Sequence, residues 1–189
     1  MRKWGLVACL LVLAGCSSFR GEMHWKVAEF NYTNQHQTNT SLASLQGTPF
    51  IAYFFFTNCT TVCPPMTMNM VKLQKELKAA GMEDYALVGF SVDPTRDTPA
   101  VITQYINQFP VADKSKWHLL TGYDEAAITT LAATSFKAIV KPEGGSQQMM
   151  HATNFYLVDQ QGFVRKSYDG YGQVPVSEIL NDLAHIQPK

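Results

Sequence analysis

The feature that most constrains the fold is an apolar run that ends in a pair of cysteines. Residues 50–56 are all apolar or aromatic and do not alternate with polar residues. This pattern predicts a strand that is covered on both faces, as in the centre of a parallel sheet. Cys59 and Cys63 follow directly, at the carboxyl end of the strand, where open α/β sheets bind their ligands. Helix formers between Pro65 and Gly81 predict a helix after the cysteines.

The remaining pattern is typical of an α/β domain. Thr98 suits the N-cap of a helix whose first residue is Pro99, and Asp124 can cap a further helix. The order strand, helix, strand, helix, followed by a hairpin and a closing helix, predicts a thioredoxin-like fold. We expect a central mixed sheet flanked by helices, with an N-terminal hairpin and inserted segments. The predicted strands are 85–92, 117–120, 154–158 and 163–168, the helices 99–109, 124–134 and 176–186, the N-terminal hairpin 27–32 with 37–40, the helical turn 41–47, the extended segment 136–140 and the polar loop 141–148.

The N-terminus looks like the signal of a bacterial lipoprotein. Two basic residues precede an apolar run over residues 4–13, which is shorter than the ~20 residues that a membrane-spanning helix needs. The run ends in Leu13-Ala14-Gly15-Cys16, which looks like a lipobox. We therefore expect lipid on Cys16 and a location at the extracytoplasmic face of the cell membrane; an ordinary signal peptide cleaved nearby is the alternative. The predicted parts are a signal peptide (1–15), a lipidated N-terminus and tether (16–26) and one folded domain (27–189).

Processing would change the number of cysteines that matter. Cys9 would leave with the signal and Cys16 would carry lipid, so the folded domain would keep only Cys59 and Cys63. An isolated pair outside the cytoplasm favours a Cys59–Cys63 disulfide. A chain of 189 residues with 46% hydrophobic residues can bury a sizeable core without such a staple. The pair is therefore predicted to be redox-active or metal-binding rather than merely structural.

The charge balance argues against nucleic acid as a partner. The formal net charge of the whole chain is zero, from 15 basic and 15 acidic residues. Removal of Arg2 and Lys3 with the signal leaves 13 basic against 15 acidic residues, a balance of −2. Nucleic-acid binding would require a basic stripe.

The cysteine spacing leaves disulfide exchange and metal binding both open. Cys63 should lie beside the positive end of the following helix, which favours its thiolate and helps either chemistry. His151 precedes the strand 154–158, and in a thioredoxin-like layout its loop packs against the cysteine loop. Two thiolates and an imidazole favour copper or zinc, and copper fits better because a structural zinc site normally has a fourth protein ligand. On residue type alone, a loop histidine is more often a surface residue than a ligand.

Several motifs together resemble the Sco/SenC family, especially its lipoprotein members from Gram-positive bacteria. The resemblance covers residues 30–186 and implies a thioredoxin-like metallochaperone, not an enzyme, that assists assembly of the Cu(A) centre in subunit II of cytochrome c oxidase. The family's copper ligands correspond to Cys59, Cys63 and His151. The family's usual histidine after Phe-Thr is replaced by Asn58, a position that is not a ligand in that pattern. The motifs are Phe56-Thr57-x-Cys59-x-x-x-Cys63-Pro64, Ser91-Val92-Asp93-Pro94-x-x-Asp97-Thr98-Pro99, Trp117-x-x-Leu120-Thr121-Gly122 and His151 before a strand.

The rival hypothesis is a membrane-anchored thiol–disulfide oxidoreductase that reduces the Cu(A) cysteines of the oxidase. Such an activity needs Cys59 and Cys63 but does not need His151. Under either hypothesis the disulfide form cannot bind metal, so a separate thiol reductant protein is an expected partner.

Neighbouring residues have competing interpretations. Asp-Pro starts turns well, which favours a turn role for Asp93, and a position around the copper ligands is the alternative. Arg96 and Asp97 could pair with each other, and an exposed pair of this kind would contribute only ~0–1 kcal/mol, or they could meet other partners. Met149 and Met150 have thioethers that can bind Cu(I), or they serve in packing.

Overall fold

The computed structural model describes residues 21–187, so the predicted signal peptide and the predicted lipidation of Cys16 lie outside the described residues. Between these limits, no helix is both long enough and apolar enough to cross a membrane. The strands are β1 (Trp25–Lys26), β2 (Asn31–Asn34), β3 (Asn39–Ser41), β4 (Phe50–Phe55), β5 (Ala86–Ser91), β6 (Trp117–Thr121), β7 (Lys141–Pro142), β8 (Met149–Met150), β9 (Asn154–Val158) and β10 (Phe163–Asp169). The helices are α1 (Leu42–Leu45), α2 (Cys63–Ala79), α3 (Pro99–Ile106), α4 (Glu125–Phe136) and α5 (Val176–His185), with a short 3-10 helix at Lys114–Lys116.

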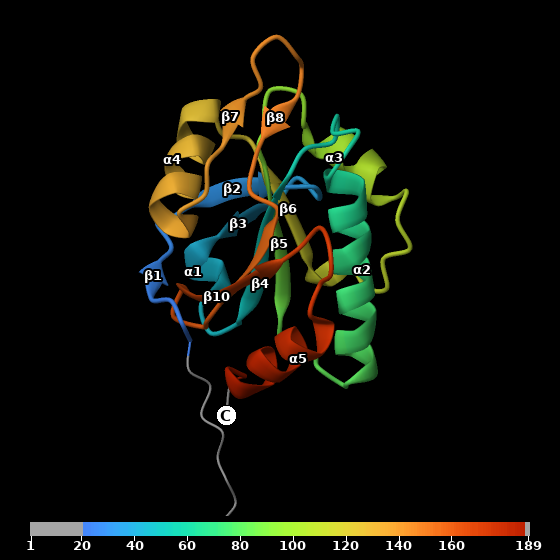
Figure 1. Cartoon of the computed structure of the whole chain (residues 1–189), viewed down its shortest axis with the longest axis vertical. Helices are drawn as coiled ribbons and strands as arrows, with labels where there is room; N and C mark the ends of the chain where they lie inside the picture. The colour runs from blue at the N-terminus through green and yellow to red at the C-terminus, as the bar shows by residue number, and fades with distance from the viewer. Residues whose placement is uncertain (1–20, 188–189) are drawn as a thin grey trace, which may run out of the picture.

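The predicted mixed sheet is confirmed, with β4 in its interior. The strand order is β1-β10-β9-β4-β5-β6-β2-β3. β4, β5 and β6 run parallel, whereas β9 is antiparallel to β4 and β2 is antiparallel to β6. Figure 1 shows α4 on one side of the sheet and α2 with α5 on the other. This is the thioredoxin-like arrangement that the element order predicts.

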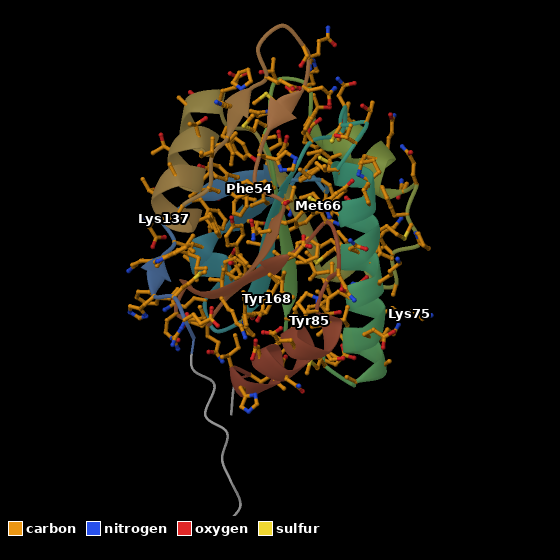
Figure 2. The ribbon with its side chains drawn as sticks, viewed as in Figure 1. Phe54, Met66, Lys75, Tyr85, Lys137 and Tyr168 are labelled. Atoms are coloured by element: carbon orange, nitrogen blue, oxygen red, sulfur yellow. The ribbon has the colours of Figure 1, made fainter. Side chains whose placement is uncertain are left out.

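The side chains of β4 alternate between the two apolar faces of the sheet, which explains the uninterrupted apolar sequence. All six residues of the strand are buried. The Phe54 ring lies edge-on to Phe136 of α4, with centroids 5.5 Å apart, whereas Phe55 stacks on Tyr105 of α3 at 6.0 Å. In Figure 2, Phe54 lies inside the molecule and Lys75 points outward from α2. A strand so enclosed fixes the position of the loop that leaves its carboxyl end.

Local features differ from the sequence predictions, among them the N-terminal hairpin, which pairs residues 31–33 with 39–41 rather than 27–32 with 37–40. Helix α2 begins at Cys63 rather than Pro65, because prolines are tolerated in a first helical turn, where their missing amide hydrogens would have no helical partner. Phe136 was predicted to be extended, but it is the buried last residue of α4, which ends at Lys137 in the left-handed conformation (φ 53°). The predicted polar loop 141–148 contains β7, which pairs with β8 in a small hairpin.

Close approach of β5 to its neighbours makes Gly89 a sensitive position. A Cβ atom at Gly89 would lie 2.6 Å from Leu119 Cδ2 and 3.0 Å from Tyr53 Cε1. We expect Gly89→Ala to lower the free energy of unfolding by about 1–3 kcal/mol through overpacking, measured by denaturant titration. Gly144→Ala is the matched control, because nothing lies within 4 Å of that position. Equal midpoints for the two variants would contradict the prediction.

Candidate metal centre

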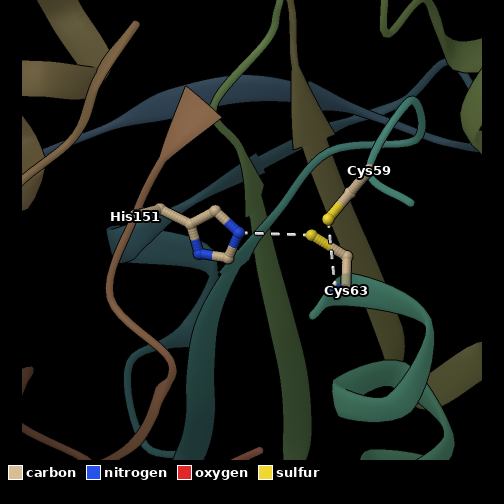
Figure 3. A group of neighbouring side chains, drawn as sticks. All are labelled: Cys59, Cys63 and His151. Carbon is tan, nitrogen blue, oxygen red and sulfur yellow. Dashed lines mark hydrogen bonds between the residues drawn. The ribbon is translucent and has the colours of Figure 1, made fainter. Parts of the chain in front are cut away.

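The fold brings together all three residues that the sequence predicts as metal ligands. Cys59 lies in the loop after β4, Cys63 is the first residue of α2, and His151 lies between β8 and β9. The Cys63 Sγ atom is 3.2 Å from His151 Nε2, and the three ligand atoms all lie within 4.8 Å of one another. Figure 3 shows the imidazole pointing at the sulfurs from the opposite side of the site.

The imidazole of His151 is oriented for its Nε2 atom to act as a ligand. Its Nδ1 atom lies 2.9 Å from the Ala152 carbonyl oxygen. Because a carbonyl can only accept, Nδ1 carries a proton, and Nε2 is the ring atom that faces the Cys63 sulfur. The ring also lies edge-on to Phe56, with centroids 5.8 Å apart. A backbone carbonyl and an aromatic ring therefore hold this side chain from outside the site, as is usual for metal-binding histidines.

The cysteine pair is strongly asymmetric. The Cys63 amide donates to Cys59 Sγ at 3.3 Å. Hydrogen bonding from the Cys63 thiol lowers the pKa of Cys59 to about 3, although burial opposes the shift. The neighbouring Cys59 sulfur, followed by burial, raises the pKa of Cys63 above its ordinary value. The metal-free reduced pair therefore holds one proton near neutral pH, and the hydrogen bond from the Cys63 amide favours the negative charge on Cys59.

This asymmetry corrects the prediction that the helix would favour the thiolate of Cys63. Pro64 and Pro65 have no amide hydrogen, and the Met66 amide donates to the Val62 carbonyl within the helix. The remaining amide of this turn, that of Cys63, donates to the sulfur of Cys59. The positive end of α2 therefore stabilises an anion on the preceding loop, not on the helix itself.

Both cysteine sulfurs are enclosed. Cys63 is fully buried and Cys59 is 6% exposed, while His151 is partly exposed. Both thiols are free in the structure, so the disulfide between them stays a prediction for the oxidised protein.

The two acidic residues of the segment after β5 have different roles. Asp93 serves in the turn, since its carbonyl accepts from the amides of Arg96 and Asp97, and its carboxylate pairs with Arg96 at 2.9 Å. Arg96 and Asp97 therefore do not pair with each other, and each meets another partner instead. Asp97 is fully buried, and its carboxylate accepts from the amide and hydroxyl of Thr57 and from the hydroxyl of Ser91.

The methionines near the site divide into two groups. Met66 and Met70 of α2 are fully buried, as expected for packing residues on one helical face. Met150, which directly precedes His151, is 49% exposed. Of these side chains, Met150 is the exposed one, and it is adjacent to His151 in the sequence.

The fold and the site together define a thioredoxin-like domain that carries a thiol pair and an imidazole at the carboxyl end of its central strand. The family model described as SCO1/SenC matches residues 21–187. The chain therefore belongs to the SCO1/SenC family.

Solved structures agree with this assignment. A SCO1/SenC family lipoprotein from Bacillus anthracis is 41% identical, with a TM-score of 0.82 over 86% of this chain and 95% of that one. BsSco, a member of the Sco family of cytochrome c oxidase assembly proteins in which a disulfide switch was identified, is 42% identical, with a TM-score of 0.79 over 85% of this chain and 92% of that one. Copper-bound ScoI from Bradyrhizobium japonicum is 28% identical, with a TM-score of 0.69 over 85% of this chain and 99% of that one.

Proposed function

We propose that this protein is a copper metallochaperone that binds one ion through Cys59, Cys63 and His151. The observation that carries the proposal is the convergence of two sulfurs and one imidazole nitrogen within 4.8 Å. Two ligand atoms that each lie ~2.0–2.3 Å from one ion are at most ~4.6 Å apart, so small side-chain movements suffice to share an ion. The copper-bound relative supports copper as the cargo.

The chemistry of the donors also favours copper over a structural zinc ion. Thiolates suit Cu(I), and an imidazole suits Cu(II), so this set can hold both oxidation states. Within residues 21–187 the group has no fourth His, Cys, Asp or Glu ligand, whereas structural zinc sites normally have four. A site of three ligands keeps the ion open to exchange with an acceptor.

The acceptor that we propose is the Cu(A) centre of cytochrome c oxidase subunit II. Family membership and the relation to an oxidase assembly protein support this choice. An acceptor of this kind supplies cysteine sulfurs, which can replace the ligands of the donor one at a time. We also propose that lipid on Cys16 anchors the protein at the extracytoplasmic face of the membrane, as the lipobox and the lipoprotein relative suggest.

Titration with copper tests the site directly. We expect the reduced protein to take up one equivalent of Cu(II) with sulfur-to-metal charge-transfer absorption, and Cys59→Ser to lose this absorption because a thiolate ligand is gone. Circular dichroism of the variant checks that it is folded. A folded Cys59→Ser protein with an unchanged spectrum would refute the ligand assignment.

One observation favours the second candidate function, thiol–disulfide exchange with the Cu(A) cysteines. The low pKa of Cys59 provides a thiolate at neutral pH, which is the form that attacks a disulfide. This reaction would not require His151. The effect of replacing His151 therefore separates the two functions, as argued in the Discussion.

A further inference from the structure

The segment between β5 and α3, residues 92–98, contacts both halves of the metal centre. We propose that this segment, hereafter the β5–α3 loop, is a positioning element that holds the cysteine loop through Asp97 and the histidine hairpin through Arg96. The histidine hairpin is residues 141–150, which β7 and β8 form immediately before His151. Neither Asp97 nor Arg96 contacts the ligand atoms, so each acts through the segment that it holds.

The contact with the cysteine loop is buried and made of several hydrogen bonds. The Asp97 carboxylate lies 2.6 Å from Thr57 Oγ1 and 3.2 Å from the Thr57 amide nitrogen. Ser91 Oγ donates to the same carboxylate at 2.6 Å. Burial raises the pKa of the Asp97 carboxyl, and the hydrogen bonds from Ser91 and Thr57 oppose that rise because they stabilise the ionised form. Because Thr57 is two residues before Cys59, these bonds fix the backbone from which the cysteine loop starts.

The contact with the histidine hairpin is more exposed and has fewer hydrogen bonds than the contact with the cysteine loop. Arg96 Nη1 donates to the Gln147 carbonyl at 3.2 Å and to the Asp93 carboxylate at 2.9 Å. Asp93 is 5% exposed, so it anchors the guanidinium from the protein side. A second tie joins the hairpin to the cysteine loop, since the Gln148 side chain donates to the Asn58 carbonyl at 3.2 Å. Residues 141–147 are all exposed, so little apolar burial holds the hairpin over the site.

The β5–α3 loop is itself well fixed, which a positioning element requires. The Asp93 carbonyl accepts from two amides, and the Asp93 amide donates to Ser91 Oγ. Thr98 caps α3 by accepting from the Val101 amide. Since Arg96 and Asp97 are adjacent on this fixed turn, the two halves of the centre share one support.

Arg96→Ala tests the histidine half. We expect amide hydrogen exchange in residues 141–150 to become about tenfold faster. Cu(II) affinity should fall by no more than about tenfold, the lower end of the range for groups bonded directly to a ligand, because Arg96 acts through the hairpin. The reduction potential of the cysteine pair should stay unchanged. Arg165→Ala is the matched control. Arg165 lies on β10, outside the metal centre, and it too pairs with a buried aspartate, Asp159, at 3.0 Å. Arg96→Lys should restore part of the affinity through Asp93.

Thr57→Val tests the cysteine half, and Asp97→Asn is its stronger companion. Thr57→Val deletes one hydrogen bond and leaves the buried carboxylate in place, so the protein should remain folded. We expect faster exchange of the cysteine-loop amides, a shifted reduction potential of the pair and weaker binding of both Cu(I) and Cu(II). Exchange in the histidine hairpin should be unchanged.

The copper measurements rest on the proposed function, whereas the exchange measurements do not. A wild-type protein without copper binding would refute the proposed function and leave exchange to decide this inference. Wild-type exchange and affinity in Arg96→Ala would overturn the histidine half. Wild-type exchange and potential in Thr57→Val would overturn the cysteine half.

Discussion

Replacing His151 with alanine is expected to abolish tight Cu(II) binding while leaving the reduction potential of the cysteine pair largely intact. His151 supplies the nitrogen of the centre, and imidazole is the ligand that suits Cu(II) here. We expect Cu(II) affinity to fall by more than about 100-fold, beyond the 10–100-fold typical for loss of an outer partner. Cu(I) binding should be partly retained, since two thiolates remain. Titration followed by charge-transfer absorption measures the first effect, and thiol–disulfide equilibration measures the second.

The same variant decides between the two candidate functions in cells. A metallochaperone that lacks His151 should support much less oxidase assembly, and added copper should restore part of it. His118→Ala is the matched control, because His118 is also partly buried and bonds Thr40 at 3.1 Å through Nδ1 in a different part of the sheet. Full oxidase assembly by His151→Ala without added copper would exclude the chaperone function and favour thiol reduction.

Much of the fold could be predicted because local sequence signals agree with the global arrangement. The uninterrupted apolar run of β4 shows that both faces are covered, and the structure places aromatic partners on both. Thr98 and Asp124 cap the helices that follow them, as predicted. These signals depend on neighbouring residues, so a single sequence contains them.

The features of the fold and site that the sequence did not predict depend on contacts between residues far apart in the chain. Asp97 meets Thr57 across 40 positions, and nothing in the Asp-Pro motif distinguishes a buried acceptor from an exposed one. His151 meets Cys63 across 88 positions, so family resemblance, not residue type, made it a strong candidate. The histidine hairpin consists mostly of polar and turn residues, which predicted a loop.

The direction of the thiol asymmetry could not be predicted either. A cysteine at a helix N-terminus usually benefits from the free amides of the first turn. Here two prolines remove two of those amides, and the amide of Cys63 points at the sulfur of Cys59. The sequence contains the prolines, but the path of the preceding loop decides which sulfur receives the amide.

Alkylation of the reduced, metal-free protein is expected at Cys59, with a rate that barely changes between pH 5 and pH 8. The pKa of Cys59 is lowered to about 3, so its thiolate is fully formed across this range. An ordinary thiol, with a pKa of ~8.5, loses about 1,000-fold of its thiolate over the same interval. Burial slows the reaction equally at each pH, so the shape of the profile is the informative quantity. Mass spectrometry of the modified peptide identifies the reacting cysteine.

Protein unfolded in denaturant serves as the control, because it should recover the steep profile of an ordinary thiol at both cysteines.

The lowered pKa of Cys59 also makes the stability of the reduced protein depend on pH. Since the pKa of Cys59 is lower in the folded state, the unfolded state binds more protons, and the stability of the reduced protein should rise from about pH 3 to about pH 8.5. Above that range the raised pKa of Cys63 reverses the trend, because the folded state then holds a proton that the unfolded state has lost.

The disulfide form has neither titrating thiol, so its stability should lack this dependence on pH. Folding therefore stabilises the dithiol, the form that can bind copper, more strongly at pH 8 than at pH 5, although reduction of the folded disulfide still takes up one proton. A steep alkylation profile for Cys59, or preferential modification of Cys63 at pH 5, would contradict the asymmetry. In that case the stabilised thiolate could not explain how the pair stays ready for metal in an oxidising compartment.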